Sequence, residues 1–308
     1  MESLEQRKEG STPALRRKCN LRRPWVIAVL VAAIIVVILV IVIPLAIILP
    51  KKNAHKGRPS TVLFPAYIYP KTNSTWDPLY EAITTFPELE FVVIVNPSSG
   101  PGSSPSPSTQ YAVAVQRLSA YSNVQKVGYV RTNYANRNIS AVLADVETYS
   151  NWTSQSTSLA MDGIFFDEIP YDYTSEKAEY LSRINDAVKA ATGIQSHRMV
   201  IHNPGTIPDS RFDMNTTDVT VVFEQSYDLY ETKIKILAET FDVSDRDANA
   251  YMLHSVPTMT NSSLKGLVGD LSQRASYLYL TTRSTDIYEA FDTQLEQFCS
   301  VVPTELNK

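Results

Sequence analysis

Cysteine and histidine are scarce in this sequence, with two cysteines and four histidines among 308 residues. So few cysteines exclude a domain held by several disulfides, and the fold must depend on its apolar core. The histidines show no His-x-x-x-His or similar metal-ligand spacing. A divalent metal held by His202 and His254 with nearby acids is therefore disfavoured, and we predict no metal site.

Glycine is also infrequent, at 10 residues, and no Gly-rich phosphate-binding fingerprint is present. We therefore expect no nucleotide, and we predict no cofactor. Basic residues are sparse beyond residue 59, where 17 Lys and Arg stand against 29 Asp and Glu, a formal charge of −12. Nucleic acid is not expected as a partner, because phosphate binding needs clustered basic side chains.

The first 59 residues have the opposite composition, with 11 basic residues and only three acids. Within them, residues 25–49 form an uncharged and almost entirely aliphatic run. A run of this length is sufficient to cross a bilayer and is too long for the core of a cleaved signal peptide. We predict a basic cytosolic tail (1–24), a transmembrane signal anchor (25–49), a linker (50–59) and one domain (60–308).

Five Asn-x-Ser/Thr sequons follow the apolar run, at Asn73, Asn138, Asn151, Asn215 and Asn261. Glycosylation at such sites occurs only in the secretory pathway, so the domain is expected to be lumenal or extracellular. The sequence thus predicts a single-pass type II membrane glycoprotein. In this topology Cys19 is cytosolic and cannot pair with Cys299, which we expect to be a buried thiol near the last helix.

Apolar strands alternate with helical stretches from residue 60 onward. The strands are expected at 61–69, 91–96, 125–132, 163–168, 198–203, 218–224, 249–255 and 276–282. The clearer helices are expected at 76–86, 109–121, 139–150, 176–192, 263–274 and 285–298. Eight strands alternating with helices predict an α/β fold, a (β/α)8 barrel of the TIM type. A doubly wound open sheet is the alternative, although it usually has fewer strands.

Acids stand at the carboxyl ends of two of these strands, where parallel α/β folds place their chemistry. Asp167 and Glu168 end one apolar strand, and Glu224 ends another. Paired carboxylates are what hydrolysis of a glycosidic bond requires. The alternative is structural, with the acids capping helices or forming ion pairs. Other polar or aromatic strand-end residues are candidates to bind sugar: Tyr67, Tyr69, Asn96, Tyr129, Asn203 and His254.

The domain resembles the spherulin-4-like family of fungal and bacterial proteins over residues 61–300. Six phrases carry the resemblance, in this order: LFPAYIYP, IVNPSSGPG, VGYVRTNYANR, GIFFDEIP, HNPGT and VVFE. The resemblance implies a (β/α)8 barrel and a glycoside hydrolase that cleaves galactosaminogalactan, an α-1,4-linked polymer of galactose, N-acetylgalactosamine and galactosamine. It also implies that Asp167, Glu168 and Glu224 are the catalytic acids.

A two-carboxylate mechanism needs one protonated and one ionised carboxyl group. We predict Asp167 as nucleophile or base and Glu224 as general acid, with the reverse assignment as the alternative. Glu168 is predicted to orient or tune one of them. The predicted activity is that of an endo-α-1,4-galactosaminidase or N-acetylgalactosaminidase on a polysaccharide. The alternatives are a glycosidase of different specificity and a non-catalytic carbohydrate-binding or cell-wall protein on the same barrel.

Overall fold

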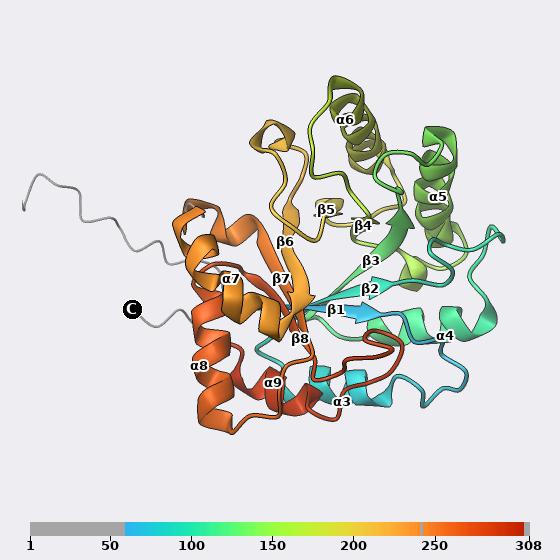
Figure 1. Cartoon of the computed structure of the whole chain (residues 1–308). Helices are drawn as coiled ribbons and strands as arrows, with labels where there is room; N and C mark the ends of the chain where they lie inside the picture. The colour runs from blue at the N-terminus through green and yellow to red at the C-terminus, as the bar shows by residue number, and fades with distance from the viewer. Residues whose placement is uncertain (1–58, 241–242, 305–308) are drawn as a thin grey trace, which may run out of the picture. The chain divides into compact units, whose positions relative to one another are not determined.

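Eight parallel strands close into a barrel in the computed structural model, which describes residues 59–240 and 243–304 (Figure 1). The chain divides into two units, Met1–His55 and Lys56–Lys308, and every described residue belongs to the second. The strands are β1 (Thr61–Ala66), β2 (Glu90–Val95), β3 (Val124–Arg131), β4 (Gly163–Asp167), β5 (Met199–Asn203), β6 (Val219–Ser226), β7 (Asn249–His254) and β8 (Tyr277–Leu280).

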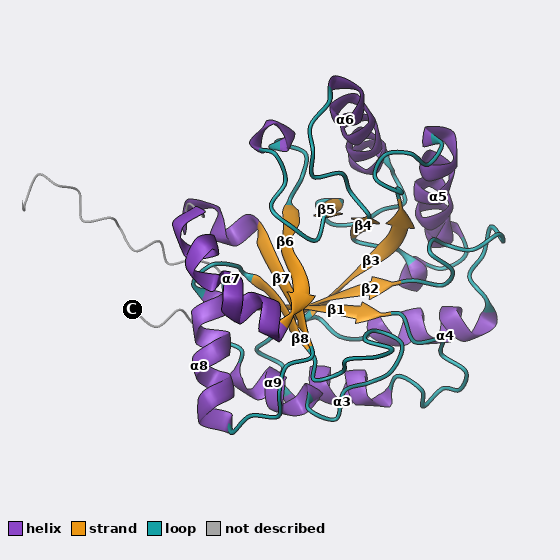
Figure 2. Cartoon of the chain, viewed as in Figure 1, coloured by secondary structure: helices purple, strands orange, loops and turns teal. Residues whose placement is uncertain are grey.

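Helices connect most of the strands and surround the barrel (Figure 2). They are α3 (Asp77–Thr85), α4 (Thr109–Leu118), α5 (Ile139–Asn151), α6 (Ser175–Ala190), α7 (Tyr227–Thr240), α8 (Asn261–Ser272) and α9 (Leu295–Val301). Short 3₁₀ helices lie at η2 (Trp152–Ser154), η3 (Thr157–Leu159), η4 (Ser210–Phe212) and η5 (Val243–Ala248). Several helices begin at a capping side chain; Thr174 Oγ1, for example, accepts a hydrogen bond from the Lys177 amide at the start of α6.

The barrel fold that the alternation predicts is confirmed. Each strand pairs in parallel with the next, and β8 pairs with β1 through Thr61 and Tyr277. This last pairing closes the sheet, so the doubly wound alternative is wrong. All eight observed strands overlap the predicted ones, because a strand covered on both faces requires a continuous apolar run.

One predicted helix, at residues 285–298, is wrong over most of its length, since α9 begins only at Leu295. Asp286 adopts a left-handed backbone with φ of 47°, which a helix cannot accommodate. The carboxylate of Asp292 accepts hydrogen bonds from Thr281 Oγ1 at 2.7 Å and from the Gln294 amide at 2.8 Å. Local bonds of this kind compete with helix formation. Residues 285–294 therefore form a loop over the barrel.

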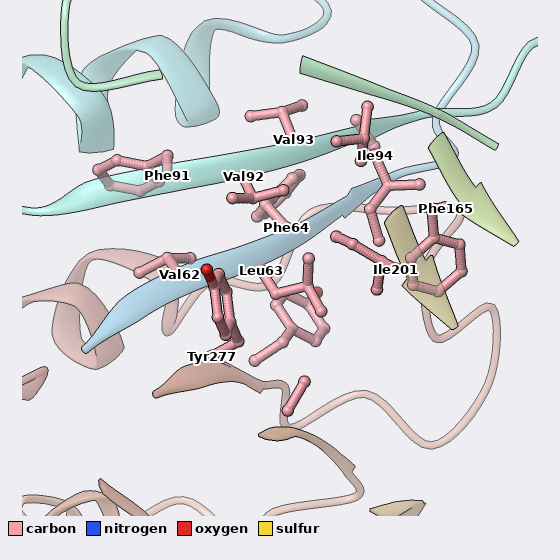
Figure 3. Packing of buried hydrophobic residues seen from close by; sticks show 14 of the residues in the cluster. Val62, Leu63, Phe64, Phe91, Val92, Val93, Ile94, Phe165, Ile201 and Tyr277 are labelled. Carbon is pink, nitrogen blue, oxygen red and sulfur yellow. The ribbon is translucent and has the colours of Figure 1, made fainter. Parts of the chain in front are cut away.

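The core is built from side chains of all eight strands and of the helices packed on them. Leu63, Phe165 and Ile201 come from three different strands and are fully buried (Figure 3). Cys299 lies in α9 with 1% of its surface exposed and is a free thiol, which confirms its predicted burial. Burial raises the pKa of this thiol to about 12, so it stays protonated and unreactive at neutral pH.

The predicted tail and anchor, residues 1–49, lie outside the described residues, as does most of the linker. In the part of the chain that the structure describes, none of the helices has the length and apolar character needed to cross a membrane. The five sequon asparagines are described, and all are exposed: Asn73, Asn138, Asn151, Asn215 and Asn261. Their exposure meets the steric requirement for glycosylation, and their occupancy stays a prediction.

Candidate active site

Strands β4, β5 and β6 are neighbours in the barrel (Figure 1). Asp167, Asn203 and Glu224 meet at the carboxyl ends of these strands. The Asn203 side-chain amide donates to both acids, with Nδ2 at 2.7 Å from Asp167 Oδ1 and 2.6 Å from Glu224 Oε2. Two bonds from one nitrogen hold these carboxylate oxygens no more than about 5.3 Å apart. A single amide thus fixes the separation of the two acids.

A β-bulge in β6 turns Glu224 toward this cluster. The register between β6 and β7 shifts between Val221 and Phe223, so Val222 is an extra residue. In a strictly alternating strand, Val219, Val221 and Phe223 would share a face and Glu224 would face the opposite way. After the bulge, Phe223 instead packs outward against the ring of Tyr230 in α7, and Glu224 faces Asn203. Bulges of this kind re-aim side chains beside functional sites.

Two tyrosine hydroxyls complete the hydrogen bonds of the acids. Tyr129 on β3 donates to Asp167 Oδ2 at 2.5 Å, and Tyr288 in the loop after β8 donates to Glu224 Oε1 at 2.6 Å. The Tyr67 ring lies edge-on between them, with ring centroids 5.4 Å from Tyr129 and 5.5 Å from Tyr288. Each acid therefore receives one tyrosine hydrogen bond in addition to its bond from Asn203.

Burial sets the charge state of this cluster. Burial first, and then the charge of Glu224, raises the pKa of Asp167 to about 6. Hydrogen bonds from Tyr129, the Glu168 backbone and Asn203 favour the ionised form but do not cancel the effect of burial. Burial also raises the pKa of Tyr67, Tyr129 and Tyr288 above the usual value, so these hydroxyls remain donors at all physiological pH values.

The folded domain matches a known protein family over nearly its whole length. The sequence model of the spherulation-specific family 4 matches residues 61–302. The chain belongs to this family. Its sequence is 27% identical over 219 residues to Spherulin-4 of Physarum polycephalum, covering 71% of this chain and 61% of that protein. The chain thus spans less than two thirds of the length of that relative.

A solved structure supports the same membership in the spherulation-specific family 4. The crystal structure of Aspergillus clavatus Sph3 in complex with GalNAc matches with a TM-score of 0.76 and 41% sequence identity. The match covers 80% of this chain and 98% of the Aspergillus chain. The resemblance that the six sequence phrases indicated is therefore confirmed.

Glu168, the third predicted acid of this family 4 domain, is held apart from the other two. Its Oε2 accepts a hydrogen bond from Arg131 Nε at 2.8 Å, and its backbone is left-handed with φ of 54°. Thr132 Oγ1 donates to the carbonyl oxygens of both Asp167 and Glu168, at 3.0 and 2.7 Å. A strained backbone at such a position persists only where surrounding bonds enforce it. These contacts fit the predicted supporting role of Glu168.

Three predicted sugar-binding residues lie outside the hydrogen-bonded cluster. Tyr69 is beyond the end of β1, is 45% exposed, and packs edge-on against Tyr111. Asn96 follows β2, and its buried Oδ1 has no hydrogen-bond partner. His254 Nδ1 pairs with the hydroxyl of the adjacent Ser255 at 3.0 Å. These residues lie at the carboxyl ends of their strands, as predicted, and their role in binding sugar stays a prediction.

Metal binding finds no support in the histidines. His202 is buried on β5 and its Nε2 pairs with Asn185 Oδ1 at 2.7 Å. Burial lowers the pKa of His202 to about 3, so the ring is neutral. Among the residues that the structure describes, His, Cys, Asp and Glu form no group of three or more suited to a metal ion.

Tyr288 is the functional candidate that sequence reasoning missed. It lies in the segment that was expected to be helical, and its only sequence signal was its aromatic side chain. Its hydroxyl reaches Glu224 across 64 residues of sequence because the loop after β8 folds over the barrel mouth. Contacts at this sequence separation are set by the closed topology and not by a local pattern.

Proposed function

We propose that this chain is a glycoside hydrolase that cleaves an amino-sugar polysaccharide, with Asp167 and Glu224 as its two catalytic acids. The observation that carries the proposal is the Asn203 amide, which donates to both carboxylates at the carboxyl end of a (β/α)8 barrel. A structural ion pair would place a cation beside each acid, whereas here neutral donors hold two acids facing each other. The relative of 41% identity that was crystallised with GalNAc supports a substrate containing this amino sugar.

In the proposed reaction, one carboxyl group protonates the glycosidic oxygen while the other attacks the anomeric carbon. The aglycone leaves with that proton, and a covalent glycosyl-enzyme forms. Water then hydrolyses this intermediate, assisted by the first carboxylate acting as base. Asn203, Tyr129 and Tyr288 hold both carboxylates in place throughout, so little reorganisation is needed.

The spacing of the acids supports retention of anomeric configuration. Retaining enzymes place their carboxyl groups about 5–5.5 Å apart, whereas inverting enzymes need about 6.5–9.5 Å to admit a water. The shared amide holds the nearest oxygens, Asp167 Oδ1 and Glu224 Oε2, no more than about 5.3 Å apart, which is closer to the retaining spacing than to the inverting one. Proton NMR of the earliest product should show the anomer of the substrate linkage; the opposite anomer as first product would exclude the double displacement.

The division of roles between the two acids is a separate proposition. The sequence predicts Asp167 as nucleophile and Glu224 as acid, but a pKa of about 6 at Asp167 favours the reverse, which the sequence also allowed. Glycosides with an activated leaving group distinguish the two. One of the variants Asp167→Asn and Glu224→Gln lacks the general acid, and it should still form the glycosyl-enzyme with these substrates. The other lacks the nucleophile and should regain activity only when azide is added.

The substrate is proposed to be galactosaminogalactan or a similar α-1,4-linked polymer containing N-acetylgalactosamine, cut internally. A panel of polysaccharides with mass analysis of the products tests this. The expected result is a ladder of GalNAc-containing oligosaccharides. Cleavage of a polymer without amino sugars would show a glycosidase of different specificity, and binding without any turnover would show a carbohydrate-binding protein.

We also propose that the domain is anchored by residues 25–49 and lies on the lumenal or extracellular side of the membrane. The uncharged run and the five exposed sequons support this topology. A polysaccharide is accessible to an enzyme on that side, which is consistent with the proposed activity.

A further inference from the structure

Three tyrosines are unusually exposed, and all follow strands in the first half of the barrel. Tyr69 follows β1, Tyr134 follows β3 and Tyr171 follows β4, with exposed fractions of 45%, 47% and 54%. Among the described residues, the only other large apolar side chain of similar exposure is Val113, on α4. The exposed aromatic rings are therefore confined to one side of the rim at the carboxyl ends of the strands.

Tyr134 is held in an unfavourable backbone conformation. Asn133, Tyr134 and Ala135 are consecutive left-handed residues, with φ of 53°, 54° and 63°. L-residues other than asparagine and aspartate rarely adopt this conformation, particularly in succession. The turn is closed by the Asn136 amide, which donates to the Asn133 carbonyl at 2.8 Å.

This strained turn is bonded directly to the candidate active site. The Tyr134 amide donates to the Glu168 carbonyl at 2.6 Å, and Glu168 adjoins Asp167. Thr132 Oγ1 donates to the carbonyl oxygens of both acidic residues. β3 and β4 are paired here in register, Arg131 with Asp167. The backbone of Tyr134 is therefore fixed relative to the segment that carries the candidate catalytic carboxylate.

Resting on the function proposed above, we propose that Tyr134 is a stacking platform for a sugar residue of the polymer next to the cleavage point. An exposed aromatic face binds the apolar face of a pyranose ring, and a rigid platform loses little entropy on binding. Tyr171 is a second exposed ring and follows β4, the strand that pairs with β3. The polymer is accordingly proposed to lie over the β1 to β4 side of the rim. Binding of several consecutive sugars there would favour cleavage of bonds inside the chain.

The test measures affinity as a function of chain length by calorimetry, with the whole chain carrying Asp167→Asn to suppress turnover. The ligands are GalNAc and its α-1,4-linked trisaccharide and hexasaccharide. Tyr134→Asn removes the ring and keeps a residue that tolerates the left-handed backbone. It should weaken hexasaccharide binding about tenfold and leave the binding of GalNAc within about twofold. Tyr134→Gly is the second variant, because glycine also relieves the strain.

Two controls separate stacking from loop disruption. Tyr134→Phe keeps the ring and should restore the hexasaccharide affinity, and Val113→Ala removes an exposed apolar side chain on α4. Equal hexasaccharide affinity in Tyr134→Asn, Tyr134→Gly and the parent would overturn this inference while leaving the proposed hydrolase intact. If the protein with the wild-type Asp167 neither binds these glycans nor cleaves the polymer, the proposed function itself is refuted.

Discussion

A carboxylate buried beside a second carboxylate destabilises the folded state when it ionises, and Asp167 is in this position. Its folded-state pKa of about 6 lies above the value of 3.8 for an unperturbed aspartate. The folded protein therefore binds a proton more tightly than the unfolded chain. The loss of unfolding free energy that ionisation of Asp167 causes is absent below about pH 4, grows between about pH 4 and 6, and is complete above about pH 6. Functional residues commonly reduce stability in this way.

Asp167→Asn should therefore stabilise the protein, and only at higher pH. Its Oδ1 can still accept from Asn203, and its Nδ2 can donate to the Tyr129 hydroxyl. The difference between the two pKa values predicts a gain in unfolding free energy of about 3 kcal/mol at pH 8 and almost none at pH 4. Denaturant unfolding at both pH values measures it. Asp186→Asn, at an exposed aspartate on α6, is the control, and an equal gain for Asp167→Asn at pH 4 would contradict the explanation.

Tyr288→Phe tests the residue that sequence reasoning missed. The change removes only the hydroxyl that donates to Glu224 Oε1 at 2.6 Å. A hydrogen bond to a charged group contributes about 1.5–3 kcal/mol, so kcat/KM should fall about 10- to 100-fold. Tyr80→Phe is the matched control, because the Tyr80 hydroxyl donates to the Ala114 carbonyl instead. Equal activity of Tyr288→Phe and the wild type would show that this bond has no catalytic role.

The predicted site residues that the structure brings together are mostly those whose position follows from the strand alone. Asp167, Asn203 and Tyr129 stand at or near the ends of buried strands, and the parallel sheet brings such positions to one face. Their hydrogen bonds were not predictable, because these depend on side-chain directions across three strands. Tyr288 was missed because a loop, and not a strand, delivers it.

At the level of single elements, the apolar runs predicted where the strands lie but not which way their side chains face. In the sequence VTVVFE all apolar residues are equivalent, so nothing marks Val222 as the bulged residue. The bulge nevertheless determines that Glu224 faces Asn203. A strand buried on both faces has no polar alternation from which its phase could be read.

Gly163, the first residue of β4, is required by close packing against β5. A Cβ at this position would lie 2.2 Å from the backbone carbonyl oxygen of Met199, which cannot move without separating the strands. Gly163→Ala should therefore destabilise the domain by about 3 kcal/mol or prevent folding. Thermal unfolding provides the measurement.

Gly269→Ala is the matched control for this element. Gly269 is inside α8, and a Cβ there would meet no heavy atom within 4 Å. Because alanine favours helices over glycine, this variant should be more stable by about 0.5–1 kcal/mol. Destabilisation of both variants to the same extent would show that the contact with Met199 is not the cause.

For the whole domain, the alternation of strands and helices was sufficient to predict a closed barrel. Each strand–helix unit is local, and parallel neighbours can be joined only by such crossovers. The segment at 285–298 shows where this reasoning fails. Its apolar residues have helical spacing, but Asp286 has a left-handed backbone and the Asp292 carboxylate accepts a hydrogen bond from the Gln294 amide, so the helix does not form. Competition between a side chain and the backbone for the same hydrogen bonds is not visible in apolar periodicity.

The proposed membrane topology makes a prediction for the whole molecule. A lumenal domain should resist protease added to sealed vesicles, and a cell-surface domain should be digested by protease added to intact cells. Deglycosylation should reduce the apparent mass of the domain. Replacing the five sequon asparagines with glutamine should abolish that shift. The type II orientation would be contradicted if deglycosylation left the mass unchanged and protease added to sealed vesicles digested the domain together with cytosol-facing markers.

Initial rates of hydrolysis of a GalNAc-containing oligosaccharide provide the most direct test of the central claim, that Asp167 and Glu224 act as one catalytic pair. Asp167→Asn and Glu224→Gln should each lower kcat by about 10³-fold or more while the protein stays folded. The double variant should be little worse than either single one, because paired residues act as a unit. Wild-type rates in either single variant would contradict this claim.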